Sequence, residues 1–401
     1  VSSLYSAINM DLETKPIIVG ERTNANGSKL FKDLLAKEDY DSIIQLAKEQ
    51  VEEGAQILDL CAAYVGRDEV RDMKEILFKL NTSISIPIMV DSTESNVIEE
   101  SLKLISGKAV VNSVNLEDGE ERVELIAKLC NRYGAALVAL TIDESGMAKS
   151  LDKKVAIAER LYKLLVDKHG MNPQDIIFDT LTFTLGAGDE EFRKAGIETI
   201  EAIREIKKRM PLAKTILAIS NISFGLDARL RSALNSVFMH EAVKAGLDMA
   251  IVNNKKIIPL HKIEDNLKKL CLDLVYDRRS FKENGECSFD PLIELLALVE
   301  DIKIDDNVKS NPYEGLSIEE ILSKRIIDGN KTNIEKDLDL ALEKGYQALD
   351  IINKFLMDGM KIVGERFGAG EMQLPFVLQS ATTMKAAVSY LNKFMDKISA
   401  N

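Results

Sequence analysis

Short apolar runs alternate with amphipathic stretches from Pro16 to about Arg279. The amphipathic stretches place apolar residues on one helical face, as Ala158, Tyr162 and Leu165 do. This alternation predicts strand and helix units around a parallel sheet. The eight strand candidates are Ile17–Gly20, Gln56–Asp59, Ile86–Asp91, Ala109–Asn112, Leu137–Asp143, Ile176–Asp179, Thr215–Asn221 and Met249–Asn253.

Eight such units within about 250 residues favour a closed (β/α)₈ TIM barrel, so the fold class is α/β. An open doubly wound sheet is the alternative. It is disfavoured because no glycine-rich dinucleotide fingerprint follows the first strand.

The pattern changes after Arg279 and becomes helical towards the end of the chain. We expect a barrel over residues 1–280, a linker over 281–313 around a helix-like piece at Pro291–Val299, and a small four-helix domain over 314–401. Its turns fall at Gly329, Gly345 and 368–370. The four predicted helices are Ser317–Asp328, Ile334–Lys344, Leu349–Phe367 and Gln373–Met395.

Composition narrows the class of protein. A net charge of −13 argues against a nucleic-acid partner, because phosphate binding favours a basic face. No apolar run is long enough to span a bilayer, so no membrane partner is expected. The chain starts Val1-Ser2-Ser3, without an initiator Met or a signal-peptide pattern, and we expect it to be a fragment of a longer cytoplasmic protein.

Cysteine and histidine do not suggest a metal centre or a disulfide framework. The four cysteines include no CxxC pair and look like reduced cytosolic thiols. The three histidines are dispersed, and we expect them to be ordinary core or surface residues.

Polar residues occur where the predicted strands end, which is where barrel enzymes carry their chemistry. Together they would form a ring of donors and acceptors suited to a flat ligand rich in N–H groups and ring nitrogens. The residues are Glu21 with Asn24, Asp59, Asp91, Asn112, Asp143, Asp179, Asn221 and Asn253.

The competing interpretation is that these residues cap the helices that follow the strands, and for any single residue it is about as good. Asn112 and Asn221 are harder to explain as caps, because a buried amide at the end of an apolar strand needs other partners. The motifs of other chemistries are absent: GxSxG, the P-loop, HExxH and a close Cys–His pair. A lysine nucleophile stays open, although no lysine ends a predicted strand.

Two sets of strings, in order, resemble cobalamin-dependent enzymes. The first resembles the pterin-binding domain of cobalamin-dependent methionine synthase and of related methyltetrahydrofolate:corrinoid methyltransferases. The second resembles the cap of the cobalamin module in methionine synthase. The first set is Gly20-Glu21-Arg22-Thr23-Asn24-Ala25-Asn26-Gly27-Ser28, Val90-Asp91-Ser92-Thr93, Val111-Asn112-Ser113, Ile177-Phe178-Asp179 and Ser220-Asn221-Ile222-Ser223-Phe224-Gly225, and the second runs from Leu356-Met357-Asp358-Gly359-Met360 through Phe367-Gly368 to Leu374-Pro375.

The resemblance implies roles for particular residues. Asp91, Asn112 and Asp179 would hydrogen-bond the pterin ring, and Asn221 would lie beside the methyl-bearing nitrogen with Arg229 near it. Asp59, Asp143 and Asn253 are weaker assignments at the rim. In the cap, Phe367 and Leu374 would shield the methyl face of the corrinoid, although their spacing fits an ordinary bundle core equally well.

The resemblance also implies the reaction, in which the methyl group of 5-methyltetrahydrofolate moves to cob(I)alamin. The nitrogen must be protonated as the methyl group leaves, and Asp179 with a bound water is the candidate for this proton route. A homocysteine domain and a cobalamin Rossmann domain with its Asp-x-His-x-x-Gly signature are not in this sequence. The cobalamin domain of the full-length chain is therefore the expected partner. This chain alone should bind corrinoid weakly or not at all, and it should make no methionine.

Two other functions are compatible with parts of the sequence. Dihydropteroate synthase binds pterins with a similar ring of Asp and Asn but has no use for the helical cap. A corrinoid-shielding module without catalysis fits the cap, but leaves the polar ring without a purpose.

Overall fold

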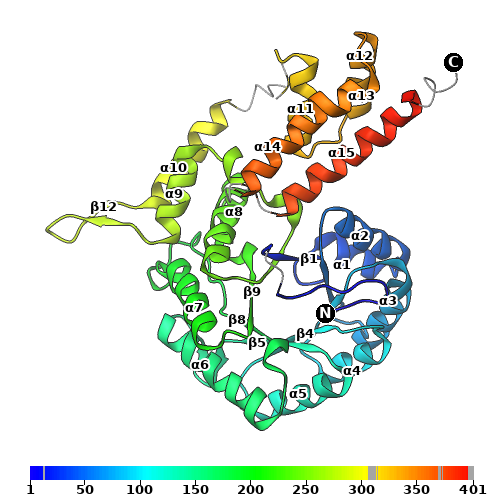
Figure 1. The fold of residues 1–401 in the computed structure, drawn as a ribbon. Coiled ribbons are helices and arrows are strands. Elements are labelled where there is room, and N and C mark those ends of the chain that lie inside the picture. The colour runs from blue at the N-terminus through cyan, green and yellow to red at the C-terminus, as the bar shows by residue number, and fades with distance from the viewer. Residues whose placement is uncertain (12–13, 306–312, 314, 369–371, 373, 396–401) are drawn as a thin grey trace. The chain divides into compact units, whose positions relative to one another are not determined.

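The structure is a computed structural model of residues 1–401, and it describes all of them except 12–13, 306–312, 314, 369–371, 373 and 396–401 (Figure 1). It divides into two compact units. The first comprises Val1–Ile258 and Glu264–Val299, and the second Pro259–Ile263 and Glu300–Asn401.

The first unit is a closed barrel of eight parallel strands, in the order β1-β10-β9-β8-β5-β4-β3-β2 (Figure 1). This confirms the predicted barrel and excludes the open sheet. The strands are β1 (Ile17–Asn24), β2 (Ile57–Cys61), β3 (Ile88–Asp91), β4 (Val110–Val114), β5 (Ala136–Leu140), β8 (Ile176–Asp179), β9 (Lys214–Ala218) and β10 (Met249–Val252).

Helices cover the outside of the barrel (Figure 1). Several begin at a side-chain cap, as α1 does at Ser28 and α6 does at Ser150. They are α1 (Lys29–Ala36), α2 (Tyr40–Glu52), α3 (Glu69–Ser83), α4 (Ser95–Leu104), α5 (Glu121–Tyr133), α6 (Leu151–Lys163), α7 (Ala195–Arg209), α8 (Ala228–Ala245) and α9 (Asp265–Val275).

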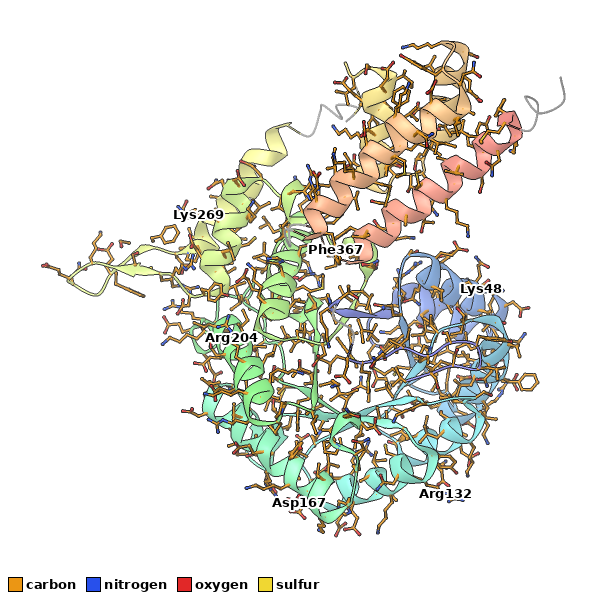
Figure 2. The ribbon with its side chains drawn as sticks, viewed as in Figure 1. Lys48, Arg132, Asp167, Arg204, Lys269 and Phe367 are labelled. Atoms are coloured by element: carbon orange, nitrogen blue, oxygen red, sulfur yellow. The ribbon has the colours of Figure 1, made fainter. Side chains whose placement is uncertain are left out.

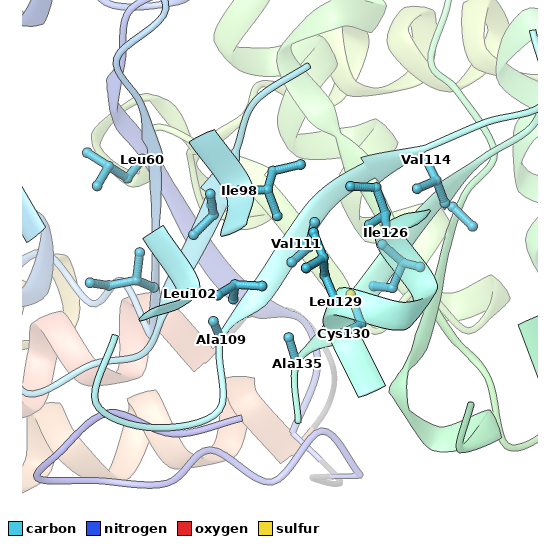
Figure 3. Close-up of a cluster of buried hydrophobic side chains, with 14 of the residues drawn as sticks. Leu60, Ile98, Leu102, Ala109, Val111, Val114, Ile126, Leu129, Cys130 and Ala135 are labelled. Carbon is cyan, nitrogen blue, oxygen red and sulfur yellow. The ribbon is translucent and has the colours of Figure 1, made fainter. Parts of the chain in front are cut away.

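The outward strand faces and the inner helix faces form the larger apolar core. Figure 3 shows Val111 of β4 among Ile98 and Leu102 of α4 and Ile126 and Leu129 of α5. All five side chains are buried, and their removal from water stabilises the fold. Charged side chains lie on the opposite helix faces and point away from the barrel, as Figure 2 shows for Lys48, Arg132, Asp167 and Arg204.

A second apolar cluster fills the barrel itself. Because side chains alternate between the two faces of a strand, every second residue points inward. The inward residues at the base and middle of the barrel are apolar and include Ile17, Val19, Ile57, Met89, Val110, Val138, Ile177, Ile216 and Met249. The barrel is therefore closed below by an aliphatic floor, and a ligand can enter only from the carboxyl ends of the strands.

The segment predicted as a linker, 281–313, contains regular structure. A short antiparallel pair, β11 (Ser280–Phe281) and β12 (Cys287–Phe289), precedes α10 (Pro291–Asp305). The predicted helix-like piece at Pro291–Val299 lies within α10. The division of the chain at residues 280 and 313 stays a prediction.

The second unit is a helical bundle with its own core, which includes Leu322, Leu338, Ile351 and Leu391. The four predicted helices correspond to α11 (Ile318–Asp328), α12 (Ile334–Glu343), the continuous run of α13 (Ala348–Asp350), η7 (Ile351–Leu356) and α14 (Met357–Gly368), and α15 (Leu374–Met395). Gly359 brings α14 against α11, because a Cβ there would lie 2.6 Å from the Ser323 carbonyl oxygen.

In the part of the chain that the structure describes, no helix combines the length and the apolar composition needed to cross a membrane.

Candidate functional site at the barrel mouth

The layer of inward positions above the aliphatic floor is polar. Glu21 comes two residues after inward Val19, Asp59 two after Ile57, and Asp91 two after Met89. By the same alternation Asn112 follows Val110, Asp179 follows Ile177 and Asn253 follows Ile251. Six of the predicted residues therefore share one layer at the carboxyl ends of the strands. The backbone N–H of Asn253 donates to Glu21 Oε1 at 3.0 Å, which links two neighbouring members directly.

Asn24 joins two of the carboxyl groups. Its Nδ2 donates to Asp59 Oδ2 at 2.8 Å and to Asp91 Oδ2 at 2.6 Å. Its Oδ1 accepts from the backbone N–H of Asn26 at 2.8 Å, which fixes the orientation of the amide. Asn24, Asp59 and Asp91 form one hydrogen-bonded cluster on three adjacent strands.

Helix capping does not explain the inward carboxylates. The helices after β2 and β3 begin later in the chain, at the N-caps Asp68 and Glu94, and not at Asp59 or Asp91. The α-helix after β8 likewise has its N-cap at Lys194, well beyond Asp179. The capping interpretation is therefore wrong for these strand ends. It is right for Asn253, which accepts from the Lys255 N–H at the start of the 3₁₀ turn Asn254–Lys256.

Burial alters the proton affinity of the layer. It raises the pKa of Asp179 to about 6 and the pKa of Asp91 to about 6, and the negative charge of Glu69 contributes to the latter. Burial also raises the pKa of Glu21. Among the described residues, neither Asp91 nor Asp179 has an ion-pair partner within 4 Å. The mouth therefore favours a ligand that brings N–H donors over an anion.

Asp179 is held in place by the loop that follows it. Its Oδ1 accepts from the backbone N–H of Leu181 at 2.7 Å. The ammonium group of Lys154 donates to the carbonyl oxygens of Thr180 and Leu181, the latter at 3.2 Å, and lies over the ring of Phe183 at 5.1 Å. The charge of Lys154 acts against the burial that raises the pKa of Asp179.

Lys154 is a residue of this site that the sequence analysis missed. Its side chain is fully buried, and burial lowers its pKa to about 8. A signal was present, because Lys154 lies four residues before Ala158 on the apolar stripe of α6. A lysine on a stripe that faces the core needs a buried partner.

Asn221 and Arg229 lie after β9. Asn221 is exposed within the 3₁₀ turn Ile219–Ser223, so its amide can reach a ligand. Arg229 is half-buried in the first turn of α8 and donates through Nε to Asp227 Oδ1 at 3.1 Å. The strand predicted to continue to Asn221 ends at Ala218, and Asn221 is carried by the turn that follows.

Asp143 is not brought into the inward layer. It lies in a two-stranded hairpin of β6 (Ile142–Asp143) and β7 (Gly146–Met147). Its Oδ1 accepts from the backbone N–H and the hydroxyl of Ser145, at 2.9 and 2.6 Å, and pairs with Lys153 at 3.3 Å. These contacts hold the pKa of Asp143 below its usual value. Its carboxylate is thus committed to the hairpin.

The two predicted cap residues are described unequally. Phe367 is half-buried near the end of α14 (Figure 2). Among the described residues, it is not one of those that form the apolar core of the second unit. Leu374 starts α15, but its side chain lies outside the described part of the chain, as do residues 369 and 370 of the predicted turn.

Comparison with known proteins shows that two ranges of the chain match two different domain families. Residues 20–253 match the family described as pterin binding enzyme, and residues 318–392 match the B12 binding domain. A dihydropteroate synthase from Clostridium difficile, solved in the presence of pteroic acid, aligns with a TM-score of 0.44 at 20% identity, over 66% of this chain and 98% of that one.

Two curated relatives are similar over almost the whole chain. It is 49% identical to the methionine synthase of Mycobacterium tuberculosis and 48% identical to that of Mycobacterium leprae, each over 99% of this chain and 33% of the relative. The chain thus spans about a third of their length. The family model matches more than half of the residues of the chain, and the matched residues include the closed barrel and its polar layer. The chain therefore belongs to the pterin binding enzyme family.

Proposed function

We propose that the chain binds 5-methyltetrahydrofolate at the barrel mouth and transfers its methyl group to cob(I)alamin, the folate half-reaction of cobalamin-dependent methionine synthase. The observation that carries the proposal is the inward layer of Glu21, Asp59, Asp91, Asn112 and Asp179, which offers acceptors and amide groups above an apolar floor. A flat pterin has apolar faces and an edge of N–H groups and ring nitrogens, so it complements both.

The relatives support this assignment. Both are methionine synthases, and residues 318–392, which follow the pterin-binding barrel in the sequence, match a B12 binding domain. The cofactor of the reaction would be cobalamin, held by the cobalamin domain of the same full-length chain. We place the protein in the cytoplasm, because all four cysteines are free thiols, as in a reducing compartment.

The chain's own residues would position the folate and supply a proton. A bound corrinoid would supply the acceptor for the methyl group, whose bond to N5 of the folate would break. The nitrogen must gain a proton, since an amide-like anion is a poor leaving group. Asp179 is suited to this task, because burial raises its pKa to about 6, so it can take up a proton and release it within about one pH unit of neutrality. Arg229 and Asn221 would complete the pocket beside that nitrogen.

Asn221→Ala should separate chemistry from binding. An amide is no acid, but its oxygen can accept a hydrogen bond from the nitrogen as that nitrogen becomes cationic. We expect the single-turnover rate constant for methyl transfer to exogenous cob(I)alamin to fall by about 10- to 100-fold, or about 1.4–2.7 kcal/mol. The dissociation constant of methyltetrahydrofolate, measured by titration calorimetry, should change less.

Equal losses in rate constant and affinity would show that Asn221 stabilises the bound folate and the transition state to the same extent. An unchanged rate constant would remove Asn221 from the catalytic residues. The same assays discriminate the alternatives: a dihydropteroate synthase would prefer a dihydropterin diphosphate, and a shielding module would bind neither ligand.

In the second unit we propose that Phe367 and Leu374 shield the methyl face of the corrinoid. Phe367→Ala should then change the unfolding free energy of the bundle by less than about 1 kcal/mol, because Phe367 is outside its core. Phe355→Ala is the matched control, since Phe355 packs on that core and meets the Tyr346 ring edge-on, with ring centroids 5.0 Å apart. It should cost several times more.

Urea unfolding followed by circular dichroism would measure both losses. Photolysis of methylcobalamin in a longer protein with the cobalamin domain would test the shield. Equal destabilisation by the two substitutions, with unchanged photolysis, would make Phe367 structural.

A further inference from the structure

Two carboxyl groups at the mouth share one hydrogen-bond donor. Asp59 Oδ2 and Asp91 Oδ2 both accept from the same nitrogen, Nδ2 of Asn24. The amide cannot be reversed, because Asn24 Oδ1 is engaged by the Asn26 N–H. The two carboxyl groups are thus neighbours whose separation is fixed by one planar amide.

In the part of the chain that the structure describes, no positively charged side chain pairs with either carboxyl group. Asp59 is 1% exposed, and among the described residues neither Asp59 nor Asp91 has a cation within ion-pair distance. The other ionisable groups that face the pair are Glu21, towards Asp59, Glu69, towards Asp91, and the thiol of Cys61. Lys256 and Arg231 act on Glu21. Two ionised carboxylates here would each lose hydration and repel each other, so one proton must remain on the pair.

The position of that proton follows from burial and hydrogen bonding. Asp59 Oδ2 is occupied as an acceptor, whereas Asp59 Oδ1 is buried and has no partner among the described residues. Asp91 is less buried than Asp59. A proton on Asp59 Oδ1 removes the charge from the more buried group and turns an unsatisfied acceptor into a donor.

We propose that Asp59 is a neutral carboxylic acid, protonated at Oδ1, which is buried and unpartnered among the described residues, beside ionised Asp91, which accepts. This inference rests on the proposed function, and it specifies the ligand. Such a donor next to an acceptor complements a heterocycle edge in which a ring nitrogen or carbonyl acceptor adjoins N–H groups, as in a pterin. A ligand edge made only of N–H donors would not satisfy Asp59.

The proton affinities of the two groups agree with this arrangement. Burial, and then the charge of Asp91, raise the pKa of Asp59 well above its usual value. Since burial brings the pKa of Asp91 to about 6, that group is ionised at neutral pH. Affinity for the folate should therefore fall below about pH 6, as Asp91 gains a proton, and fall again at high pH, as Asp59 loses its proton.

The first test concerns the protein without ligand. In protein labelled with ¹³C at the aspartate carboxyl carbons, we expect an acid-form resonance at pH 8 that Asp59→Asn lacks and Asp118→Asn keeps. Asp118 is the control because it is exposed on the loop after β4. If every aspartate carboxyl resonance of the unaltered protein has the chemical shift of a carboxylate at pH 8, the proposal is overturned. This outcome does not depend on whether Asp59→Asn folds.

The second test is the pH profile of methyltetrahydrofolate binding by titration calorimetry. Asp59→Asn should lose the high-pH decline and keep the low-pH one. Asp91→Asn should reduce the low-pH decline without abolishing it, because the pKa of Asp179 is also raised to about 6. Protonation of the ligand itself changes the affinity of every variant equally at a given pH, so it cancels when the affinities of the variants at that pH are compared. A high-pH decline that persists in Asp59→Asn overturns the proposal. If the unaltered protein fails to bind methyltetrahydrofolate at any pH, the proposed function is rejected instead. The acid-form carboxyl resonance of the first test would still show whether Asp59 is protonated.

Discussion

Asp91→Ala is expected to weaken binding of 5-methyltetrahydrofolate by about 1–3 kcal/mol, or about 5- to 150-fold in Kd. Asp91 is an inward carboxylate whose Oδ2 accepts a hydrogen bond from Asn24 Nδ2 at 2.6 Å. Among the described residues, no cation lies within ion-pair distance of it. A pterin N–H that pairs with it would be left buried without a partner in the variant. Titration calorimetry at pH 7 would measure the loss.

Asn112→Ala should weaken binding within the same range, because Asn112 occupies the inward position of the adjacent strand, paired in register with Asp91. Asp118→Ala is the control for both, being exposed on the loop after the same strand. Affinities of the two inward variants equal to that of the control would place the folate elsewhere.

The barrel could be predicted because its strands are buried on both faces and interrupted by amphipathic helices. Ile176–Asp179 was predicted with the observed bounds, and the other seven strands were found with shifted ends. The shifts occur where local turn chemistry overrides the apolar run. Thr215–Asn221 is cut at Ala218 because the chain turns into a 3₁₀ helix, and Leu137–Asp143 is split because Asp143 starts a hairpin.

For the candidate site, the sequence could predict the residues whose inward positions follow from the alternation of side chains along a strand. Asp59, Asp91, Asn112 and Asp179 all fall in the inward register, and none of these positions depends on long-range detail. The clustering of Asp59 with Asp91 through Asn24 could not be predicted, because it depends on the register between three strands and on a break in pairing within β1.

Sequence patterns on helices were less informative about chemistry. Lys154 was overlooked because a single lysine on an amphipathic helix usually lies on the solvated face. Here its ammonium group reaches two carbonyl oxygens of the loop that carries Asp179, so its role depends on where that loop passes. Only the folded chain shows this.

Asp179→Asn is expected to stabilise the barrel at neutral pH while it impairs methyl transfer. Because Asp179 has a pKa of about 6 in the folded chain against an ordinary 3.8, the folded state holds a proton that the unfolded state releases. This contribution to stability is complete below about pH 4 and is lost as the pH rises through about 6. The difference corresponds to about 3 kcal/mol at pH 7.

Asparagine is neutral at every pH and keeps an oxygen to accept from the Leu181 N–H. The variant should therefore exceed the unaltered protein in unfolding free energy by up to about 3 kcal/mol at pH 7 and match it near pH 4, measured by urea unfolding at both pH values. Asp118→Asn should show no such dependence. The rate of methyl transfer by Asp179→Asn should fall because the amide cannot pass a proton to the folate nitrogen. A variant that gains no stability between pH 4 and 7 would show that Asp179 is ionised in the fold without cost, and would remove it as the source of that proton.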